Sequence, residues 1–371
     1  MAGFECSSHR RPDGLRLDLI RSTGHDTLAL QDYRSCRSLG IRTVRDGVRW
    51  HLIEQQPGIY DWSSWQPMLE ATEEAGVQPI WDLCHYGFPD HLQLDSATFI
   101  DAYADFAAEA ARVHRHVTGR APLVCPINEI SYFAWAVNTG YFPRIALDER
   151  GWFKRHLVRA ALAGVRAMRA VDPGCRFLWA EPLINILPRS SEEADVDRAE
   201  KLRLAQYEAY DMLLGRAAPE LGGSPDAVDL VGLNFYPDNQ WIEGGSAVPL
   251  GNHDYRPLAD MLTEAFERFG KPIFISETGA ERSARPSWFH YVCGEVRTAL
   301  SQGVPIHGIC IYPVTTYPGW DDSRHAEVGL FSTPHSDGER RVFEPMASEL
   351  ERQEQLFSRH RPSQLWRVNA A

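Results

Sequence analysis

The segment APLVCPINEISYFAW, residues 121–135, contains the pattern from which the fold can be predicted. An apolar run, residues 121–127, leads directly into Asn128 and Glu129, and aromatic residues follow at once. A buried charge is costly unless it is paired or has a chemical function, so burial alone gives no reason for a carboxylate at this place. We therefore expect residues 121–128 to form a buried strand whose carboxyl end carries function.

The pattern of an apolar strand with a polar end recurs along the chain. Eight strand-like runs are expected at residues 2–6, 41–50, 77–84, 121–128, 175–180, 228–235, 272–277 and 305–312. Segments with helical periodicity lie between them, and 98–117 and 151–171 are the clearest examples. Glycine or proline follows several of these helices just before the next strand, as is typical of helix ends.

About eight alternations of strand and helix predict an α/β fold, a (β/α)₈ TIM barrel formed by residues 1–371 as a single domain. The main alternative is a doubly wound sheet, which would carry a glycine-rich phosphate-binding turn after its first strand. The chain contains neither G-x-G-x-x-G nor G-x-x-x-x-G-K. The barrel is therefore the expected fold, and we expect no cofactor.

Composition narrows the class of partner. The net charge of −12 disfavours binding to nucleic acid or to an anionic membrane. No apolar run approaches about 18 residues, so no membrane span is expected. The seven cysteines form no C-x-x-C pair, and the N-terminus lacks a signal-peptide pattern. A reducing cytoplasm is the expected compartment, with neither nucleic acid nor membrane as a partner.

In a TIM barrel the active site lies at the carboxyl ends of the strands. The expected strand ends carry Arg45, Asp82, His85, Asn128, Glu129, Glu181, Asn234, Tyr236, Glu277 and Tyr312. Glu129 and Glu277 end the fourth and seventh strands, which lie nearly opposite each other in an eight-stranded ring. Retaining glycosidases use two carboxyl groups roughly 5–5.5 Å apart, one as nucleophile and one as acid and base. This pair of glutamates predicts that chemistry, with aromatic rings stacked on the sugar.

Around these residues the chain resembles the clan A retaining glycoside hydrolases, and most closely glycoside hydrolase family one, the β-glucosidase family. The Asn-Glu pair at 128–129 and ISETG at 275–279 are similar to the two acid motifs of that family. LCHYGFPDHL, 83–92, resembles its L-x-H-W-D-x-P segment, and VGLNFYP, 231–237, resembles its L-G-x-N-Y-Y segment. Residues 23–62 resemble the opening of the family. The likeness covers most of the chain, with the motifs in the family's order.

This resemblance implies a role for each matching residue. Glu277 would be the nucleophile and Glu129 the general acid/base. The other implied catalytic residues are Arg45, Asn128 and Tyr236, and the implied substrate-binding residues are His85, Asn234, Tyr312 and Trp320. The implied substrate is a small-molecule or oligosaccharide β-glycoside, hydrolysed or transferred by double displacement.

Three departures from the family pattern are visible. The family has a Glu-Trp pair after the eighth strand, whereas this chain has Gly319 before Trp320. Asp321 and Asp322 are the candidates to replace that glutamate. A glutamine near the end of the first strand is also missing. CSSHR, 6–10, places His9 or Arg10 nearby, and His9 is the candidate for substrate binding. The chain is also shorter than a typical member.

Two other functions fit parts of the pattern. A non-catalytic sugar-binding barrel would keep the fold and the altered loop. A metal-dependent lyase of enolase type would use Asp82, Glu129 and Glu181 on neighbouring strands. However, no lysine is suitably placed as its base, and too little chain precedes the first strand for a capping domain. His114 and His116 lie on an expected helix, where residues two apart do not face each other, and we expect no metal site.

Overall fold

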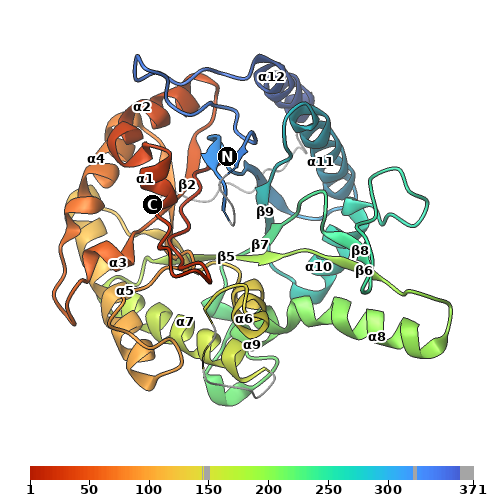
Figure 1. The fold of residues 1–371 in the computed structure, drawn as a ribbon, viewed down its shortest axis with the longest axis horizontal. Coiled ribbons are helices and arrows are strands. Elements are labelled where there is room, and N and C mark those ends of the chain that lie inside the picture. The colour runs from red at the N-terminus through yellow and green to blue at the C-terminus, as the bar shows by residue number, and fades with distance from the viewer. Residues whose placement is uncertain (144, 146–150, 321–323, 360–371) are drawn as a thin grey trace.

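The computed structural model describes residues 1–143, 145, 151–320 and 324–359. Eight parallel strands close into a barrel, and helices surround it (Figure 1). In order around the barrel these strands are β1 (Ala2–Gly3), β2 (Thr43–Gly47), β3 (Gln78–Cys84), β4 (Leu123–Ile127), β5 (Arg176–Pro182), β7 (Leu230–Asn234), β9 (Ile273–Thr278) and β10 (Ile306–Ile311). The predicted TIM barrel is confirmed, and each expected strand overlaps one strand of the barrel.

The helices fall into a longer and a shorter group. The longer helices are α2 (His25–Ser38), α4 (Gln66–Ala75), α5 (Ala97–Thr118), α6 (Ile130–Thr139), α7 (Trp152–Val171), α8 (Glu193–Leu204), α10 (Leu258–Phe269), α11 (Ala284–Ser301) and α12 (Glu344–Arg359). The short ones are α1 (Leu19–Ser22), α3 (Trp50–Ile53) and α9 (Glu208–Leu213). No helix in the described part of the chain combines the length and apolar character needed to cross a membrane.

The first strand is shorter than the expected run 2–6. After Gly3 the Phe4 amide still donates to the Arg45 carbonyl of β2, at 2.9 Å. The Glu5 carboxylate then accepts the Ser7 amide at 3.0 Å, which turns the chain away from the ladder. The local side-chain hydrogen bond therefore ends β1 early.

The lower part of the barrel is filled by apolar side chains from alternate strands. Ile80, Leu178 and Phe274, from β3, β5 and β9, form one layer. Because side chains alternate along a strand, Asp82 and Ser276, two residues further on, also point inward. The interior thus changes from apolar to polar towards the carboxyl ends of the strands.

Two glycines allow the close packing that this arrangement needs. A Cβ on Gly232 of β7 would lie 2.2 Å from the Trp179 carbonyl oxygen and 2.7 Å from Ser276 Oγ. A Cβ on Gly164 of α7 would lie 2.6 Å from the Tyr103 ring of α5. Gly164 lies on the buried face of α7, the helix that the periodicity of residues 151–171 predicts.

Two small sheets extend the barrel. β6 (Asn185–Leu187) pairs with β8 (Gln240–Ile242), and α8 projects from the barrel beside them (Figure 1). In the long loop after β10, β11 (Tyr317–Pro318) pairs with β12 (His325–Ala326). Trp320 follows β11, the first strand of this second sheet, by two residues.

Candidate active site

A pocket of about 610 Å³ opens at the carboxyl ends of the barrel strands. The predicted residues that line it are His85, Glu129, Tyr236, Glu277, Tyr312 and Trp320. Arg45, Asn128 and Asn234 are buried behind its wall, where they hold the lining residues. Asp321 and Asp322, the predicted replacements for the loop glutamate, lie outside the described residues.

Glu277 near the end of β9 is surrounded by hydrogen-bond donors. Arg45 Nη1 donates to its Oε1 at 2.6 Å, and the Tyr236 hydroxyl donates to its Oε2 at 2.8 Å. A guanidinium and a phenol hydrogen bond both stabilise the anionic carboxylate. The environment of Glu277 therefore suits a carboxylate nucleophile.

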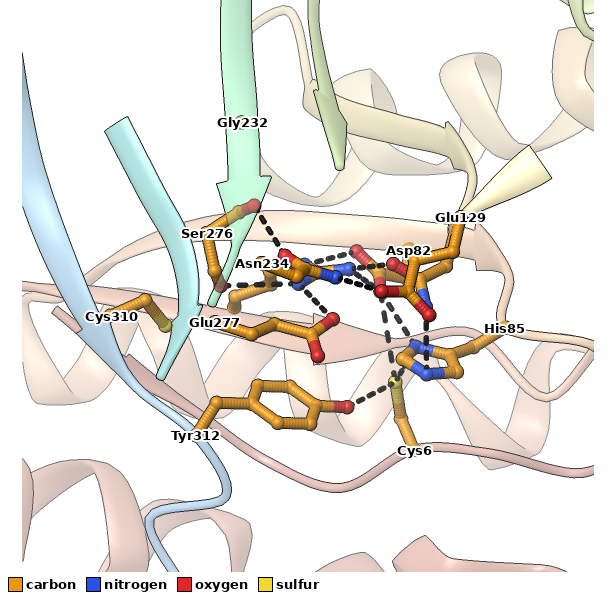
Figure 2. A network of polar contacts seen from close by, with 12 residues as sticks. Cys6, Asp82, His85, Glu129, Gly232, Asn234, Ser276, Glu277, Cys310 and Tyr312 are labelled. Atoms are coloured by element: carbon orange, nitrogen blue, oxygen red, sulfur yellow. Dashed lines mark hydrogen bonds and ion pairs between the residues drawn. The ribbon is translucent and has the colours of Figure 1, made fainter. Parts of the chain in front are cut away.

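Arg45 connects Glu277 to a second acid inside the barrel. Its Nε and Nη2 donate to the two oxygens of Asp82 at 2.9 and 2.7 Å, and Nη2 also donates to Asn128 Oδ1 at 2.6 Å. Burial favours the neutral form of Asp82, but the Arg45 charge and the His85 ring outweigh it and hold the Asp82 pKa below its ordinary value. Figure 2 shows this network, in which the side chains of Asp82, His85 and Glu277 lie close together.

Glu129 has the opposite environment. The Tyr86 hydroxyl donates to Oε2 at 2.5 Å, and Asn234 Nδ2 donates to Oε1 at 2.8 Å. Burial raises the Glu129 pKa to about 8, and the charge of Glu277 adds to this rise, although the two hydrogen bonds act against it. Glu129 therefore keeps its proton near neutral pH, as a general acid must.

Tyr86 is a partner of Glu129 that the sequence analysis did not select. Both residues have a left-handed backbone, with φ of 65° for Tyr86 and 44° for Glu129. This conformation is unfavourable for residues other than glycine and is typically found where function requires it. Asn128 Nδ2 donates to the Tyr86 hydroxyl at 2.9 Å, which orients the phenol towards Glu129. Its position next to His85, where the family motif has tryptophan, was the available signal.

Cys6, Asp82 and His85 are the described residues whose grouping could hold a metal ion, with ligand atoms within 4.8 Å of one another. The guanidinium of Arg45 already occupies both Asp82 oxygens, and a second cation beside it would be repelled. Burial raises the pKa of the Cys6 thiol well above its ordinary value, so the thiolate that a metal prefers is disfavoured. These residues fit a hydrogen-bonded network better than a metal site.

His9, predicted to bind substrate, lies outside the main pocket. Its ring packs against Phe142 and Trp320, with centroids 4.5 and 4.4 Å away. Burial lowers the His9 pKa to about 3, so the ring is neutral. The chain turns at Glu5, before the expected end of the first strand. His9 therefore packs against Trp320 instead of lining the main pocket.

The three acids that a metal-dependent lyase would need do not converge. Arg45 occupies Asp82, whereas Glu181 accepts the Ser131 amide of α6 at 3.1 Å on Oε2. Burial raises the Glu181 pKa to about 7. Glu181 thus contacts the start of a helix, and the arrangement gives no support to the lyase alternative.

Comparisons with known proteins identify the fold. No protein-family model matches the chain, and no curated protein sequence matches it. The β-glucosidase from Thermotoga maritima in complex with glucoimidazole superimposes with a TM-score of 0.73 at 16% identity, over 89% of this chain and 87% of that chain. A β-glycosidase crystal structure superimposes with a TM-score of 0.73 at 19% identity, over 94% and 89% of the two chains.

A third solved structure is the virulence factor SghA in complex with its substrate analogue salicin. It superimposes with a TM-score of 0.73 at 17% identity, over 89% of this chain and 85% of that chain. At such low identity these likenesses establish the fold alone. The chain has the barrel fold of family-one β-glucosidases, and its structural similarity to them spans about nine-tenths of its length.

Proposed function

We propose that the protein is a retaining β-glycosidase, with Glu277 as nucleophile and Glu129 as general acid/base. The observation that carries this proposal is the contrast between two glutamates in one pocket. Glu277 is held as an anion by Arg45 and Tyr236, and Glu129 keeps a proton because it is buried close to that anion. Two carboxyl groups with opposed protonation states are what double displacement requires.

In the first step Glu277 attacks the anomeric carbon. The bond between that carbon and the aglycone oxygen breaks, and Glu129 transfers its proton to the leaving oxygen. A covalent glycosyl ester forms on Glu277, whose charge is thereby lost. The pKa of Glu129 then falls, because the anion that helped to raise it is gone.

In the second step Glu129 acts as a base. It takes a proton from water, whose oxygen attacks the anomeric carbon and breaks the ester bond. Glu277 returns to its anionic state between Arg45 and Tyr236, and Glu129 is protonated again. A sugar hydroxyl in place of water gives transglycosylation by the same step.

The test is covalent trapping with dinitrophenyl 2-deoxy-2-fluoro-β-glucoside, with the matching galactoside as a second reagent. The fluorine slows both chemical steps. The dinitrophenol is a good leaving group and makes the first step fast again, so the ester on the enzyme accumulates. We expect one adduct per chain, mapped to the peptide that contains Glu277. An adduct on another residue would contradict the assignment. A folded protein that forms no adduct and cleaves no aryl β-glycoside would support the non-catalytic sugar-binding barrel.

A further inference from the structure

Besides Glu129 and Glu277, the inner part of the pocket has the carboxyl group of Glu5, a residue that was not predicted from the sequence. The residue follows β1 and is 6% exposed, and it lines the pocket together with Glu129 and Glu277. Its Oε1 accepts hydrogen bonds from the amide and the hydroxyl of Ser7. No hydrogen bond to its Oε2 is found among the described residues. This oxygen reaches the pocket, where the hydroxyl groups of a ligand can donate to it.

The donors expected to hold a sugar are already engaged elsewhere. Trp320 Nε1, the single donor of the indole, donates to Ser7 Oγ at 2.7 Å. The Nδ1 of His85 lies 2.9 Å from Asp82 Oδ2, and its Nε2 lies 3.1 Å from Asn128 Nδ2. In this arrangement the indole N–H of Trp320 and the ring nitrogens of His85 form hydrogen bonds within the protein.

A chain of two hydrogen bonds links the loop after β10 to the segment that follows β1. Trp320 donates to Ser7, and Ser7 donates to Glu5. Gly319, beside Trp320, also lines the pocket and has no side chain to offer. Burial raises the Glu5 pKa, while the nearby His85 and the Ser7 hydrogen bonds lower it. The loop that carries Gly319 and Trp320 is therefore tied through Ser7 to the carboxyl group of Glu5.

We propose that Glu5 is a specificity-determining residue, whose free oxygen accepts hydrogen bonds from hydroxyl groups of the glycone, with Ser7 as its positioning residue. This proposal rests on the proposed glycosidase function and deepens it. It gives the carboxylate contact to the segment that follows β1 instead of to the loop after β10, the eighth strand of the barrel.

The same geometry assigns the substrate class. Glu5 and Glu277 make the inner pocket acidic, Glu129 keeps its proton, and the guanidinium of Arg45 is already shared by Asp82, Glu277 and Asn128. A uronate or phosphate on the glycone would face these acids, whereas hydroxyl groups donate to them. The glycone that fits is a neutral, fully hydroxylated sugar.

The acid–base pair at the pocket rim does not change this charge. Arg324 lines the pocket, and its guanidinium pairs with Glu281 at 2.8 Å. Its side chain is 54% exposed, so solvent weakens its attraction for an anionic glycone. β-Glucuronides and 6-phospho-β-glucosides should therefore be poor substrates compared with the neutral glycoside that is cleaved best.

The test measures binding by titration calorimetry, so that it does not depend on turnover. The probes are an uncleavable aryl β-thioglycoside of the best neutral glycone and its 3-deoxy, 4-deoxy and 6-deoxy analogues. Wild type is compared with Glu5→Gln, which keeps the shape, and with Glu5→Ala, which removes the acceptor. Asp238→Asn makes the same charge change at an exposed residue of the pocket mouth and serves as the control.

We expect Glu5→Gln to weaken binding of the full thioglycoside about ten- to a hundredfold, the loss typical of a charged hydrogen bond. At least one deoxy analogue should bind wild type more weakly than the full thioglycoside does, by a similar factor. The affinity of this analogue should fall little further in the Glu5 variants. Asp238→Asn should bind every probe like wild type. If the Glu5 variants weaken all four probes equally, or none of them, the assignment of Glu5 is wrong even though the enzyme binds and cleaves glycosides. If wild type neither binds nor cleaves any β-glycoside, the proposed function fails, and this proposal fails with it.

Discussion

Two buried networks of charged side chains start from neighbouring residues of β2, Arg45 and Asp46. Successive side chains of a strand point to opposite faces. Arg45 therefore points into the barrel and bonds Asp82 and Glu277, whereas Asp46 points outward and bonds His25 of α2. Both are nearly inaccessible to solvent, with 1% and 0% exposure. One position along the chain separates two networks with different tasks.

The outer network is closed. Asp46 Oδ2 accepts the Tyr33 hydroxyl at 2.6 Å and lies 2.7 Å from His25 Nε2. The other ring nitrogen of His25 lies 2.7 Å from Asp32 Oδ2, and Arg340 pairs with Asp32 at 2.6 Å. Two acids face two basic groups, and the contacts join β2, α2 and the loop before α12.

The inner network is open on one side. Arg45 is bonded to two acids, but Glu129, Glu277 and Glu5 line a pocket that a substrate can enter. Acidic groups outnumber the bases there, and Glu129 is left protonated because it is buried and because the charge of Glu277 adds to the rise of its pKa. The comparison teaches that burial and charge alone do not identify a functional site. The inner network differs from the outer one in two ways. Its acidic groups outnumber its basic groups, and some of its carboxyl oxygen atoms reach a cavity.

The largest effect should come from exchanging one carboxylate for its amide in each network. Glu277→Gln removes the nucleophile, and we expect kcat/KM on aryl β-glycosides to fall on the order of 10⁴-fold or more, with the fold intact. Asp46→Asn breaks a buried charged contact and should lower the free energy of unfolding by about 3–5 kcal/mol. Chemical denaturation and initial rates per folded molecule measure both. If Asp46→Asn abolished activity in the folded protein, the division into a catalytic and a structural network would be wrong.

The next effect concerns the proton on Glu129. Glu129→Ala should reduce the hydrolysis of alkyl β-glycosides by about 10²–10⁴-fold, because their leaving groups need a proton. The leaving group of a dinitrophenyl glycoside needs little protonation. The rate of the glycosylation step should therefore fall less for this substrate. Added azide should restore turnover of the dinitrophenyl substrate and yield the β-glycosyl azide. Equal losses on both substrates, with no azide product, would show that Glu129 is not the acid/base.

A smaller effect is expected at Tyr86, whose hydroxyl donates to Glu129. Tyr86→Phe removes a hydrogen bond that favours the ionised carboxyl, so the Glu129 pKa should rise further above about 8. The alkaline limb of the kcat/KM profile should move to higher pH, with a rate loss of roughly three- to tenfold. Tyr33→Phe, the same change in the outer network, should lower stability and leave the profile unchanged. A Tyr86→Phe profile identical to that of wild type would remove Tyr86 from the site.

The fold was predictable from the sequence because the alternation of strands and helices follows from which faces are buried. The same alternation placed Glu129, Glu277, Arg45 and Tyr236 near strand ends, and the structure brings these four side chains to one end of the barrel. Their chemical roles stay predictions until the experiments are done. The parts of the site that depend only on strand position were thus accessible from sequence.

Other parts depend on contacts that a sequence does not display. Glu5 was hidden inside an expected strand that in fact ends at Gly3, because Ser7 bonds to it. The left-handed backbone of Tyr86 depends on packing around the barrel mouth. His9 was predicted to bind substrate because the family's glutamine near the end of the first strand is missing, but the chain turns at Glu5 and His9 packs against Trp320 instead.

The last prediction concerns the pH dependence of the outer network. Burial disfavours a charged His25, but the charge of Asp46 and the contact with Asp32 outweigh it and raise the His25 pKa to about 9. An unfolded histidine titrates near 6.5, so protonated His25 stabilises the fold fully below about pH 6.5, and this contribution is lost as pH rises through about 9. The loss between these pH values should be on the order of 1–3 kcal/mol.

Urea denaturation at pH 6, 7.5 and 9 measures this loss of stability. His25→Gln is the control, because the difference between it and wild type cancels every other titrating group, including the buried N-terminal amine whose pKa burial lowers. Wild type should lose its advantage over His25→Gln as pH rises. A difference that stays constant from pH 6 to 9 would mean that His25 is neutral and that the outer network is held by hydrogen bonds without its charge.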